Sequence, residues 1–345
     1  MSKIIFVVDD NDINLTMAKE ALKDEYRVMT LPSAAKMFAM MEKMTPDLIL
    51  LDIEMPEMDG FEALQLLKAN ENTARIPIIF LTSMTDTAIE VKGFEMGVVD
   101  FVGKPFSEPV LRNRIKSHLD IDGLIRERTA QLQEKTIELQ RIQTGVVSVL
   151  ADTVANRDYV TGGHIQRTSI YLSILLEELL ARDLHKEIIE STNMDMLILS
   201  ARLHDVGKIT ISDFVLNKEG KLTDEEFVIM KSHSAEGARI IEQMIERVGD
   251  VEFLQNAKIF AGAHHERWDG RGYPNGTAGE ATHVFARAMA VVDVYDALVS
   301  VRPYKTGMTS EQAVAMIVEN AGTQFDPVMA KVLEESQERF KAVSR

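Results

Sequence analysis

Short apolar runs alternate with helical patterns over the first 120 residues. Runs rich in β-branched and aliphatic side chains occur at 3–8, 26–30, 47–51, 77–81 and 98–102. Segments with helical periodicity lie between them, and another follows Pro105. Strands that alternate with helices predict a parallel sheet with helices on both faces, so we expect a five-stranded α/β domain over residues 1–120. Ligands of such sheets bind beyond the carboxyl ends of the strands.

Residues 121–145 have a different character, with no Pro and many Glu, Gln and Arg side chains. Apolar residues recur every seven positions from Ile125 to Val146, whereas Arg128 and Lys135 occupy the second apolar position of the heptad. We expect a connecting helix here. Two interpretations stay open: the helix pairs with a second copy in a parallel homodimer, or it is a single solvated helix packed on a neighbouring domain.

The pattern of residues 146–345 is almost entirely helical. Helices are predicted over 146–156, 169–183, 194–205, 225–248 and 285–300. Thr223 followed by Glu226 forms a capping-box signature at the start of the helix that carries His233. The glycine-rich stretch 269–279 contains one Pro and predicts a loop. The second half is therefore expected to be an all-α domain.

Composition and charge restrict the class of protein. A chain of 345 residues accommodates two domains. The absence of Cys excludes disulfides, thiolate metal sites and a Cys nucleophile. The formal net charge of −16 argues against a DNA-binding protein, because that function needs a basic face. Since no apolar run approaches the length of a membrane span or of a signal-peptide core, we expect a cytoplasmic protein.

Carboxylates follow two of the predicted strands. Asp9 and Asp10 directly follow the first strand, and Asp52 ends the third. These strands are neighbours in a five-stranded parallel sheet, so the three carboxylates should meet at one edge. Such a cluster is costly unless a cation holds it together, and oxygen-only ligands suit Mg²⁺. Thr82, at the end of the fourth strand, and Lys104, after the fifth, would face the same pocket.

The motifs VVDDN, LLDIEMPEMDG, FLTS and DFVGKPF occur in this order over residues 3–120. With them, the segment resembles the receiver domain of two-component response regulators. The resemblance implies a flavodoxin-like parallel sheet. It implies that a sensor histidine kinase phosphorylates Asp52. It also implies that Asp9, Asp10 and the carbonyl group of Glu54 hold Mg²⁺.

Three further receiver residues receive roles from the same resemblance. Thr82 and Lys104 would contact the phosphoryl oxygens, and Phe101 would occupy the aromatic switch position. The expected chemistry agrees, because the metal and Lys104 would neutralise the carboxylate and the incoming phosphoryl group.

Five histidines and two aspartates of the second half are candidate metal ligands: His164, His204, Asp205, His233, His264, His265 and Asp293. Adjacent ionisable pairs such as His204–Asp205, within the apolar segment 197–205, need compensation if they are buried. Imidazoles with a few carboxylates suit Fe, Mn, Zn, Co or Ni rather than Mg²⁺.

Seven ligands exceed what one ion usually takes, so we expect two ions that share a bridging carboxylate. Two ions about 3.5–4 Å apart are the usual arrangement for in-line displacement at phosphorus. Lys208 follows His204 by one helical turn and can project over the same site. The alternative role for Lys208 is a favourable contact with a helix C-terminus.

The motifs RDYVTGGH, HDVGKI, HSAEG, HHERWDGRGYP, ARAMAVVDVYDAL and RPYK follow one another over residues 146–345. With them, this half resembles the HD-GYP phosphodiesterases, a branch of the all-α HD-type metal-dependent phosphohydrolases. The resemblance implies a substrate, cyclic di-GMP, that is opened to linear pGpG and in some members cut on to GMP. It implies two transition-metal ions, with Fe expected and Mn as the alternative.

The same resemblance assigns the ligands. One ion would be held by His164, His204, Asp205 and Asp293, and Asp205 would bridge to a second ion that is completed by His233, His264 and His265. Some members of the family bind a third ion through a Glu where this chain has Val160, so we expect two ions. Asp205 and Lys208 are then the expected catalytic residues.

Substrate contacts are also implied. Lys208 would contact one phosphate, Gly272, Tyr273 and Pro274 would border the site, and Arg302 and Lys305 would hold the other phosphate and the guanine side. Arg271 either adds positive charge at the rim or is simply exposed. Trp268 either stacks on a base or packs within its loop. In the family, the GYP region also contacts diguanylate cyclase domains, which are candidate partners.

The sequence is thus interpreted as a response regulator whose output is a cyclic di-GMP phosphodiesterase controlled by phosphorylation of Asp52. Three alternatives stay open. The substrate could be 3′,3′-cyclic GMP-AMP or pGpG, because a metal core recognises phosphates rather than bases. The domain could bind cyclic di-GMP or a partner with low turnover. The domain could also be a different type of HD hydrolase that acts on mononucleotides. The GYP loop and the RPYK motif argue against this third alternative.

Overall fold

The computed structural model describes residues 2–83, 87–157, 163–300 and 307–343. The chain divides into two compact units, Met1–Ile137 and Glu138–Arg345. None of the described helices combines the length and the hydrophobicity that a membrane crossing requires. Three residues considered above, Val160, Arg302 and Lys305, lie outside the described parts of the chain.

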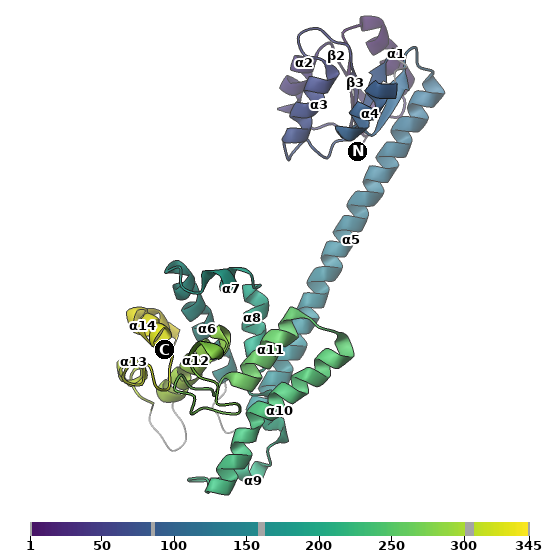
Figure 1. Ribbon diagram of the computed structural model, residues 1–345. Helices are drawn as coiled ribbons and strands as arrows, with labels where there is room; N and C mark the ends of the chain where they lie inside the picture. Colours follow the sequence, from purple (N-terminus) through teal and green to yellow (C-terminus); the bar gives the residue numbers. More distant parts are fainter. Residues whose placement is uncertain (1, 84–86, 158–162, 301–306, 344–345) are drawn as a thin grey trace. The chain divides into compact units, whose positions relative to one another are not determined.

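Five parallel strands form the sheet of the first unit, in the order β2-β1-β3-β4-β5. Figure 1 shows this sheet near the N-terminus of the chain. They are β1 (Ile4–Val8), β2 (Arg27–Leu31), β3 (Leu48–Asp52), β4 (Ile78–Thr82) and β5 (Asp100–Gly103). Each predicted strand is found close to its expected position. The prediction that the first and third strands are neighbours is confirmed, since Val7 pairs with Leu50.

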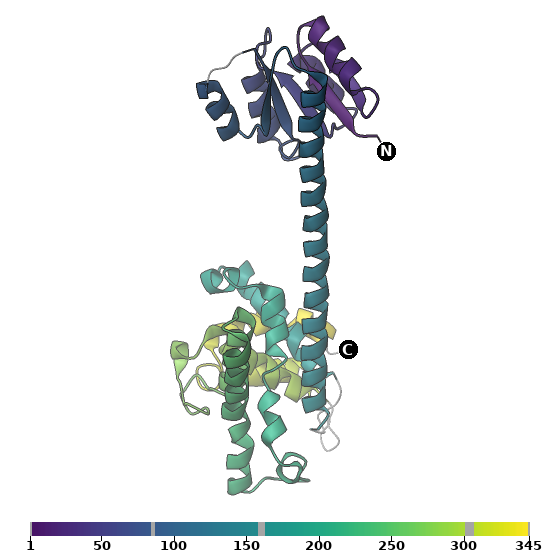
Figure 2. The ribbon, with the colours of Figure 1, turned by 90° about the vertical axis from the view of Figure 1, so that its right-hand side faces the viewer.

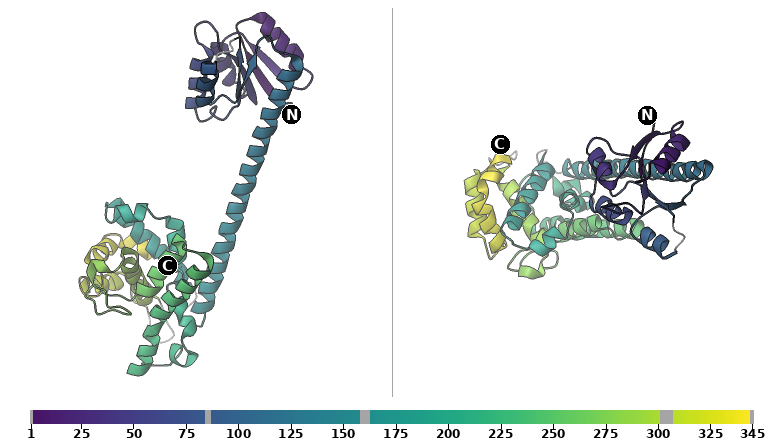
Figure 3. Two further views of the ribbon diagram at one scale, coloured as in Figure 1. Left: turned by 45° about the vertical axis from the view of Figure 1, so that its right-hand side comes forward. Right: turned by 90° about the horizontal axis from the view of Figure 1, so that it is seen from above.

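Helices cover both faces of this sheet (Figure 3). They are α1 (Asp12–Leu22), α2 (Ala34–Met41), α3 (Gly60–Ala69), α4 (Thr87–Glu95) and the first turns of α5 (Glu108–Ala155). Strand side chains alternate between the faces: Phe6 packs in one core with α2 and α3, and Ile5 packs in the other with α1 and α5. The predicted α/β fold with two helical layers is confirmed.

One 48-residue helix, α5, replaces three predicted segments: the helix after Pro105, the connecting helix over 121–145 and the helix over 146–156 (Figure 2). The chain has no Pro between Pro109 and Pro274. The two glycines within the helix, Gly123 and Gly145, each cost only about 1 kcal/mol. No strong breaker therefore separates the segments, and they merge.

The second unit consists of helices. They are α6 (His164–Ala181), α7 (Lys186–Glu190), α8 (Met194–Ala201), the 3₁₀ helix η1 (Val206–Thr210), α9 (Asp213–Leu216), α10 (Asp224–Val248), α11 (Glu252–Ala263), the 3₁₀ helix η2 (Gly279–Ala281), α12 (Val284–Val299), α13 (Ser310–Glu319), α14 (Pro327–Glu335) and α15 (Gln337–Val343). The capping box predicted at Thr223 and Glu226 is present at the start of α10. The all-α prediction is confirmed for the described residues.

Two apolar cores hold these helices together. The larger core joins α6, α8 and α12 to α13, α14 and α15, and it is centred on the packed rings of Tyr171, Tyr295 and Phe340. The smaller core joins the C-terminal end of α5, through Val147, to α8, α10 and α11. The same core contains Val206, directly after the His204–Asp205 pair, so the end of α5 packs against the segment that carries these residues.

The helix predicted over 194–205 ends earlier than expected. α8 stops at Ala201, His204 and Asp205 lie in the turn that follows, and Lys208 lies in η1. The reason is tertiary: a Cβ atom at Gly207 would lie 1.9 Å from the carbonyl oxygen of His233. Only a glycine permits this close approach of η1 to α10, which brings Asp205 next to His233.

Candidate active site

The seven candidate ligands of the second half come from separate segments and converge. His164 begins α6, His204 and Asp205 follow α8, His233 lies in α10, His264 and His265 follow α11, and Asp293 lies in α12. Ligand atoms form two groups in which all members lie within 4.8 Å of one another: His164, His204 and Asp205, and His233, His264 and His265.

Hydrogen bonds orient four of the imidazoles so that their Nε2 atoms face the centre. In each of them Nδ1 is the donor. His164 donates to Asp296 Oδ2 (2.7 Å) and His204 to Ala201 O (2.9 Å). His233 donates to Met230 O (2.7 Å) and His264 to Phe260 O (2.8 Å). A carbonyl oxygen only accepts, so the proton of the neutral ring sits on Nδ1 and the lone pair on Nε2. Nε2 of His204 is buried and has no hydrogen-bond partner among the described residues, which is the arrangement that a metal ion would complete.

Asp205 lies between the two groups. Its Oδ1 is 3.5 Å from His233 Nε2 and 3.7 Å from His264 Nε2, whereas its Oδ2 is 3.5 Å from His204 Nε2. Each carboxylate oxygen thus faces a different group of imidazoles. Asp293 joins the first group, with Oδ1 3.4 Å from His164 Nε2.

Burial keeps most of these imidazoles neutral, the form that ligates metals. It lowers the pKa of His264 to about 3 and that of His265 well below the usual value, and it also lowers the pKa of His233. His204 differs, because Asp205 and Asp293 raise its pKa despite its burial. Burial opposes ionisation of Asp205 too, but Lys208 and His204 hold the pKa of Asp205 well below its usual range.

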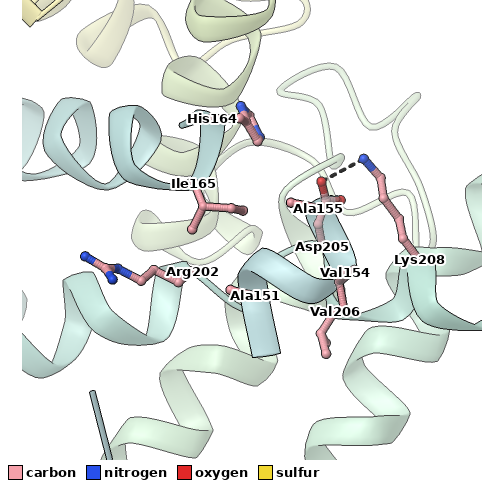
Figure 4. Close-up of a pocket in the computed structure, with 9 residues that line it drawn as sticks. All are labelled: Ala151, Val154, Ala155, His164, Ile165, Arg202, Asp205, Val206 and Lys208. Atoms are coloured by element: carbon pink, nitrogen blue, oxygen red, sulfur yellow. Dashed lines mark ion pairs between the residues drawn. The ribbon is translucent and has the colours of Figure 1, made fainter. Parts of the chain in front are cut away.

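Lys208 reaches back from η1 to this centre. Its Nζ lies 2.8 Å from Asp205 Oδ2, and Figure 4 shows the pair beside Ala151 and Val154 of α5. Arg157, two residues beyond the end of α5, fixes the backbone after Lys208. Its guanidinium donates to the carbonyl oxygens of Ile209 (2.8 Å) and Ile211 (3.1 Å) and to Asp213 Oδ1 (2.8 Å).

Asp296 and Arg167 contribute to the site but were not predicted from the sequence. Asp296 is 1% exposed, accepts the Nδ1 proton of His164, and is held by Arg167 through Nε (2.6 Å) and Nη2 (3.0 Å). The sequence signal was the spacing of Asp293 and Asp296, three residues apart on one face of a predicted helix. Carboxylates that orient a ligating imidazole from behind are regular parts of metal sites.

The loop with Gly272, Tyr273 and Pro274 borders the second group of histidines. The Tyr273 ring lies on His265, with 4.7 Å between ring centroids. Glu266, a residue that the sequence did not single out, is 4% exposed and shapes the loop by accepting the backbone N–H groups of Asn275 (2.8 Å) and Thr277 (3.1 Å).

Trp268 and Arg271, each with two possible roles in the sequence, have defined surroundings in this loop. The Trp268 ring lies against the guanidinium of Arg287, 5.6 Å from it, and the Trp268 backbone N–H donates to Gln324 O (3.1 Å). Trp268 therefore packs between its loop and neighbouring segments. Arg271 is exposed at the rim, where its backbone N–H donates to Asp269 Oδ1 (3.0 Å).

The receiver pocket of the first unit brings its predicted residues to the carboxyl edge of the sheet. Lys104 Nζ lies 2.7 Å from Asp9 Oδ2 and 2.7 Å from Asp52 Oδ1. Asp10 is exposed, and its ligand atoms lie within 4.8 Å of those of Asp9 and Asp52. The backbone N–H of Glu54 points to Asp52 Oδ1 at 3.4 Å. This oxygen-only set suits a hard divalent cation.

Burial raises the pKa of the Asp52 carboxyl, and the nearby charge of Asp9 raises it further. Lys104 lowers this pKa but does not cancel the increase. Thr82 is buried at the end of β4, on the same edge. Phe101 is also buried, and its ring contacts Phe94 edge-on with 5.1 Å between centroids. The aromatic side chain at the expected switch position thus packs inward, against α4.

Comparison with known proteins matches both units. The HD domain family matches residues 148–329, and the response regulator receiver domain family matches residues 5–116. A "Probable cyclic di-GMP phosphodiesterase" of Vibrio cholerae is 38% identical over 97% of this chain and 78% of its own length. The cyclic di-GMP phosphodiesterase response regulator RpfG of Xanthomonas campestris is 34% identical over 94% of this chain and 85% of its own length.

A third relative shares only part of the chain. The "3′3′-cGAMP-specific phosphodiesterase 2" of Vibrio cholerae is 35% identical over 60% of this chain and 37% of its own length. HD domains of this kind are phosphohydrolases that depend on divalent metal ions, in agreement with the grouped ligands described above. The chain therefore belongs to the family of response regulators that join a receiver domain to a metal-dependent HD phosphohydrolase domain.

Proposed function

We propose that this chain is a two-component response regulator that hydrolyses cyclic di-GMP to pGpG, and onward to GMP if the linear product rebinds. The names of two relatives that match almost the whole chain support this substrate. The observation that carries the proposal is the position of Asp205, whose two carboxylate oxygens face separate groups of imidazole Nε2 atoms. Such a set suits a pair of divalent ions that share one carboxylate.

The residues present fit this metal pair. His164, His204, Asp205 and Asp293 would hold one ion, and Asp205, His233, His264 and His265 the other. When bound, the ions would neutralise phosphate oxygens and activate water near neutral pH. Imidazole-rich donors suit a transition metal, and among these the family resemblance favours Fe, with Mn as the alternative. Asp9, Asp10 and the carbonyl group of Glu54 would hold Mg²⁺.

The protein's own groups would bind and orient the substrate. Lys208 offers a positive charge next to Asp205 and would contact a phosphate oxygen, which makes it the residue that orients the reacting phosphate. Tyr273 packs on His265 and forms a wall beside the second ligand group. Asp296 and Arg167 hold His164 in the tautomer that exposes Nε2.

Regulation would begin with transfer of a phosphoryl group from a sensor histidine kinase to Asp52. Lys104, already paired with Asp52, would neutralise the phosphoryl oxygens, with Thr82 alongside and Phe101 as the switch residue. If this is right, beryllium fluoride with Mg²⁺ changes the turnover of the wild-type protein by about 5–150-fold, the usual range of allosteric coupling. Asp52→Asn should abolish the response, and an unchanged response in this variant would exclude Asp52 as the phosphorylation site.

Two protein partners complete the proposal. The exposed apolar stripe of α5, which includes Leu132 (69% exposed) and Leu139 (66%), supports a parallel homodimer. The loop around Tyr273 would contact diguanylate cyclase domains. Light scattering of the wild-type protein and of a Leu132→Glu, Leu139→Glu variant tests the dimer, which predicts halving of the mass in the variant.

A second substrate deserves a direct test, because one relative is named for 3′3′-cGAMP. Metal ligands and Lys208 recognise phosphates and do not distinguish bases. A panel of cyclic di-GMP, 3′3′-cyclic GMP-AMP and pGpG, with kcat/KM measured for each, should give cyclic di-GMP the largest value. A larger value for another member of the panel would make that molecule the substrate.

The proposal as a whole is tested by purifying the protein with and without oxygen, counting its metal ions and separating the products formed from cyclic di-GMP. We expect pGpG to appear in the oxygen-free preparation loaded with Fe²⁺ or Mn²⁺. Asp205→Asn is the matched control, because it removes the shared carboxylate while keeping the side-chain shape. Stoichiometric binding of cyclic di-GMP without product, in a metal-loaded protein, would favour a binding module instead.

A further inference from the structure

A hollow of about 270 Å³ opens beside the second ligand group, and its walls contain His264 and His265. Its further walls include the aromatic rings of Phe227 and Tyr273, the cations Lys231, Arg267 and Arg271, and the carboxylate of Glu266. Small-molecule sites begin at about 300 Å³, so the hollow suits one ring system rather than a whole cyclic dinucleotide. Any role of this hollow in substrate binding rests on the proposed function, because the hollow belongs to the same site.

Lys231 is one of the cations that line this hollow. It lies on α10, two residues before His233, and its Nζ is 4.5 Å from the centroid of the Phe227 ring and 5.6 Å from that of Tyr273. No carboxylate within the described ranges lies at ion-pair distance from Lys231. The charge is thus held between aromatic faces, where its hydrogen-bond donors stay available to a ligand.

Local structure explains this placement. Phe227 and Lys231 are four residues apart on α10 and share one helix face. The capping box formed by Thr223 and Glu226 fixes the start of α10 one turn before Phe227. Tyr273 is brought opposite by its contact with His265, so the aromatic walls and the ligand group form one unit.

The two arginines of the neighbouring loop differ in availability. Arg267 is occupied, because its Nε and Nη2 donate to the carboxylate of Asp269 (3.0 and 2.9 Å). Arg271 lines the hollow with an exposed side chain, and only its backbone N–H contacts Asp269. Glu266 also lines the hollow, but its two carboxylate oxygens accept the backbone N–H groups of Asn275 and Thr277. The side chains of Lys231 and Arg271 therefore offer donors to a ligand, whereas the acceptors of Glu266 are engaged.

We propose that this hollow receives one purine base of the dinucleotide, and that Lys231 makes the site selective for guanine. The rings of Phe227 and Tyr273 would form apolar walls against which the base packs. Guanine presents two acceptors, N7 and O6, on one edge, whereas adenine places an amino donor next to its N7. A lysine ammonium can only donate, so it stabilises the guanine edge and disfavours the adenine edge.

The test compares Lys231→Gln with Arg239→Gln, which removes one positive charge from the same helix at an exposed position outside the hollow. The readouts are kcat and KM for cyclic di-GMP and the inhibition constants of GMP and AMP, with metal content as the check on the ligand cage. In Lys231→Gln, we expect the KM and the inhibition constant of GMP to rise about tenfold, the discrimination typical of a base-edge contact. The inhibition constant of AMP, kcat and metal content should stay unchanged, as should every parameter of Arg239→Gln.

Two results would overturn this inference alone. Equal increases in the inhibition constants of GMP and AMP would mean that Lys231 contacts a phosphate, and no increase for either would mean that the base lies elsewhere. Failure of the metal-loaded wild-type protein to hydrolyse cyclic di-GMP would instead overturn the proposed function. Lys231→Arg, which keeps a donor in the hollow, should retain the preference for GMP.

Discussion

The receiver pocket and the histidine centre differ in how their buried charges are compensated. In the receiver pocket, Lys104 lies 2.7 Å from both Asp9 and Asp52, so the carboxylates already have a cationic partner within the protein. In the histidine centre, Nε2 of His204 is buried without a hydrogen-bond partner among the described residues. The receiver carboxylates are thus compensated by a cation of the protein itself. In the histidine centre Lys208 pairs with Asp205 in the same way, but the buried imidazole nitrogen of His204 is left for a bound cation to satisfy.

The chemistry of the donors follows the same division. The receiver pocket offers only oxygen atoms and includes the exposed carboxylate of Asp10, which suits weak and exchangeable Mg²⁺. The histidine centre offers mainly neutral imidazoles, which favour tightly held transition metals. We therefore expect the first site to exchange its cation readily and the second to retain its ions through purification.

Loss of the shared carboxylate should have the largest effect. Asp205→Asn keeps the size of the side chain but removes the charge that faces both groups of imidazoles. We expect a loss of metal and of turnover beyond the 10–100-fold that is typical for removal of an outer-shell partner. Metal analysis and product formation from cyclic di-GMP check this. Full activity at full metal content would contradict the shared role of Asp205.

Loss of Asp296 should have the next largest effect, because this residue orients His164 without lying among the candidate ligands. Asp296→Ala removes the acceptor of the His164 Nδ1 proton, and we expect metal affinity to fall by about 10–100-fold. Competition with a chelator measures the affinity. Asp296→Asn keeps an acceptor oxygen and should be less severe; an Asp296→Ala variant with wild-type affinity would rule out the orienting role.

Arg157 should have a smaller effect, on turnover rather than on metal. Arg157→Ala removes the hydrogen bonds that fix the backbone after Lys208. We expect kcat to fall about tenfold, because a small displacement of a group at the reacting centre slows the reaction. KM and metal content should stay unchanged. Arg157→Lys keeps the charge but cannot span several acceptors, so it should behave similarly. Arg239→Gln serves as the control for charge. A purely structural role would lower thermal stability and leave kcat unchanged.

Acid should destabilise the metal-free second unit through its buried imidazoles. The pKa of His264 is about 3 in the folded chain and about 6.5 when unfolded, so its contribution to stability is complete above pH 6.5 and is lost as the pH falls towards 3. Between pH 7.5 and 5.5, this group alone should cost about 1 kcal/mol of unfolding free energy. His233 and His265 act in the same direction, whereas His204, with its raised pKa, opposes them.

Trp268 is the single tryptophan of the chain and lies in the second unit, so its fluorescence in denaturant titrations reports this effect selectively. The receiver pocket should respond in the opposite sense at Asp52, because burial raises the pKa of that carboxyl and its protonation favours the folded state. Equal stability of the second unit at pH 7.5 and 5.5 would contradict the account of the neutral imidazoles.

The sequence predicted those features that depend on local patterns. Alternating apolar runs predicted every strand of the sheet, and the pair Thr223 and Glu226 predicted the start of α10. The His204–Asp205 and His264–His265 pairs were recognisable because adjacent ionisable residues in apolar segments need a partner. The structure brings all seven candidate ligands together, as the count of donors suggested.

Features that depend on tertiary contacts were not predicted. The partner of Asp296 is His164, 132 positions away, and nothing local distinguishes Asp296 from a solvated helix carboxylate. Glu266 acts through backbone N–H groups of a loop whose path is invisible in the sequence. The early end of α8 depends on the contact between Gly207 and the carbonyl oxygen of His233, which only the packed fold creates.

The most direct test of the central claim is a metal count per chain by elemental analysis, after oxygen-free purification and dialysis against buffer without Mg²⁺. If the histidine centre holds a pair of ions through Asp205 while the receiver pocket exchanges its cation, the protein retains two transition-metal ions and no Mg²⁺, and Asp205→Asn loses them. Retention of one ion or none by the wild-type protein, or of two by Asp205→Asn, would contradict the account.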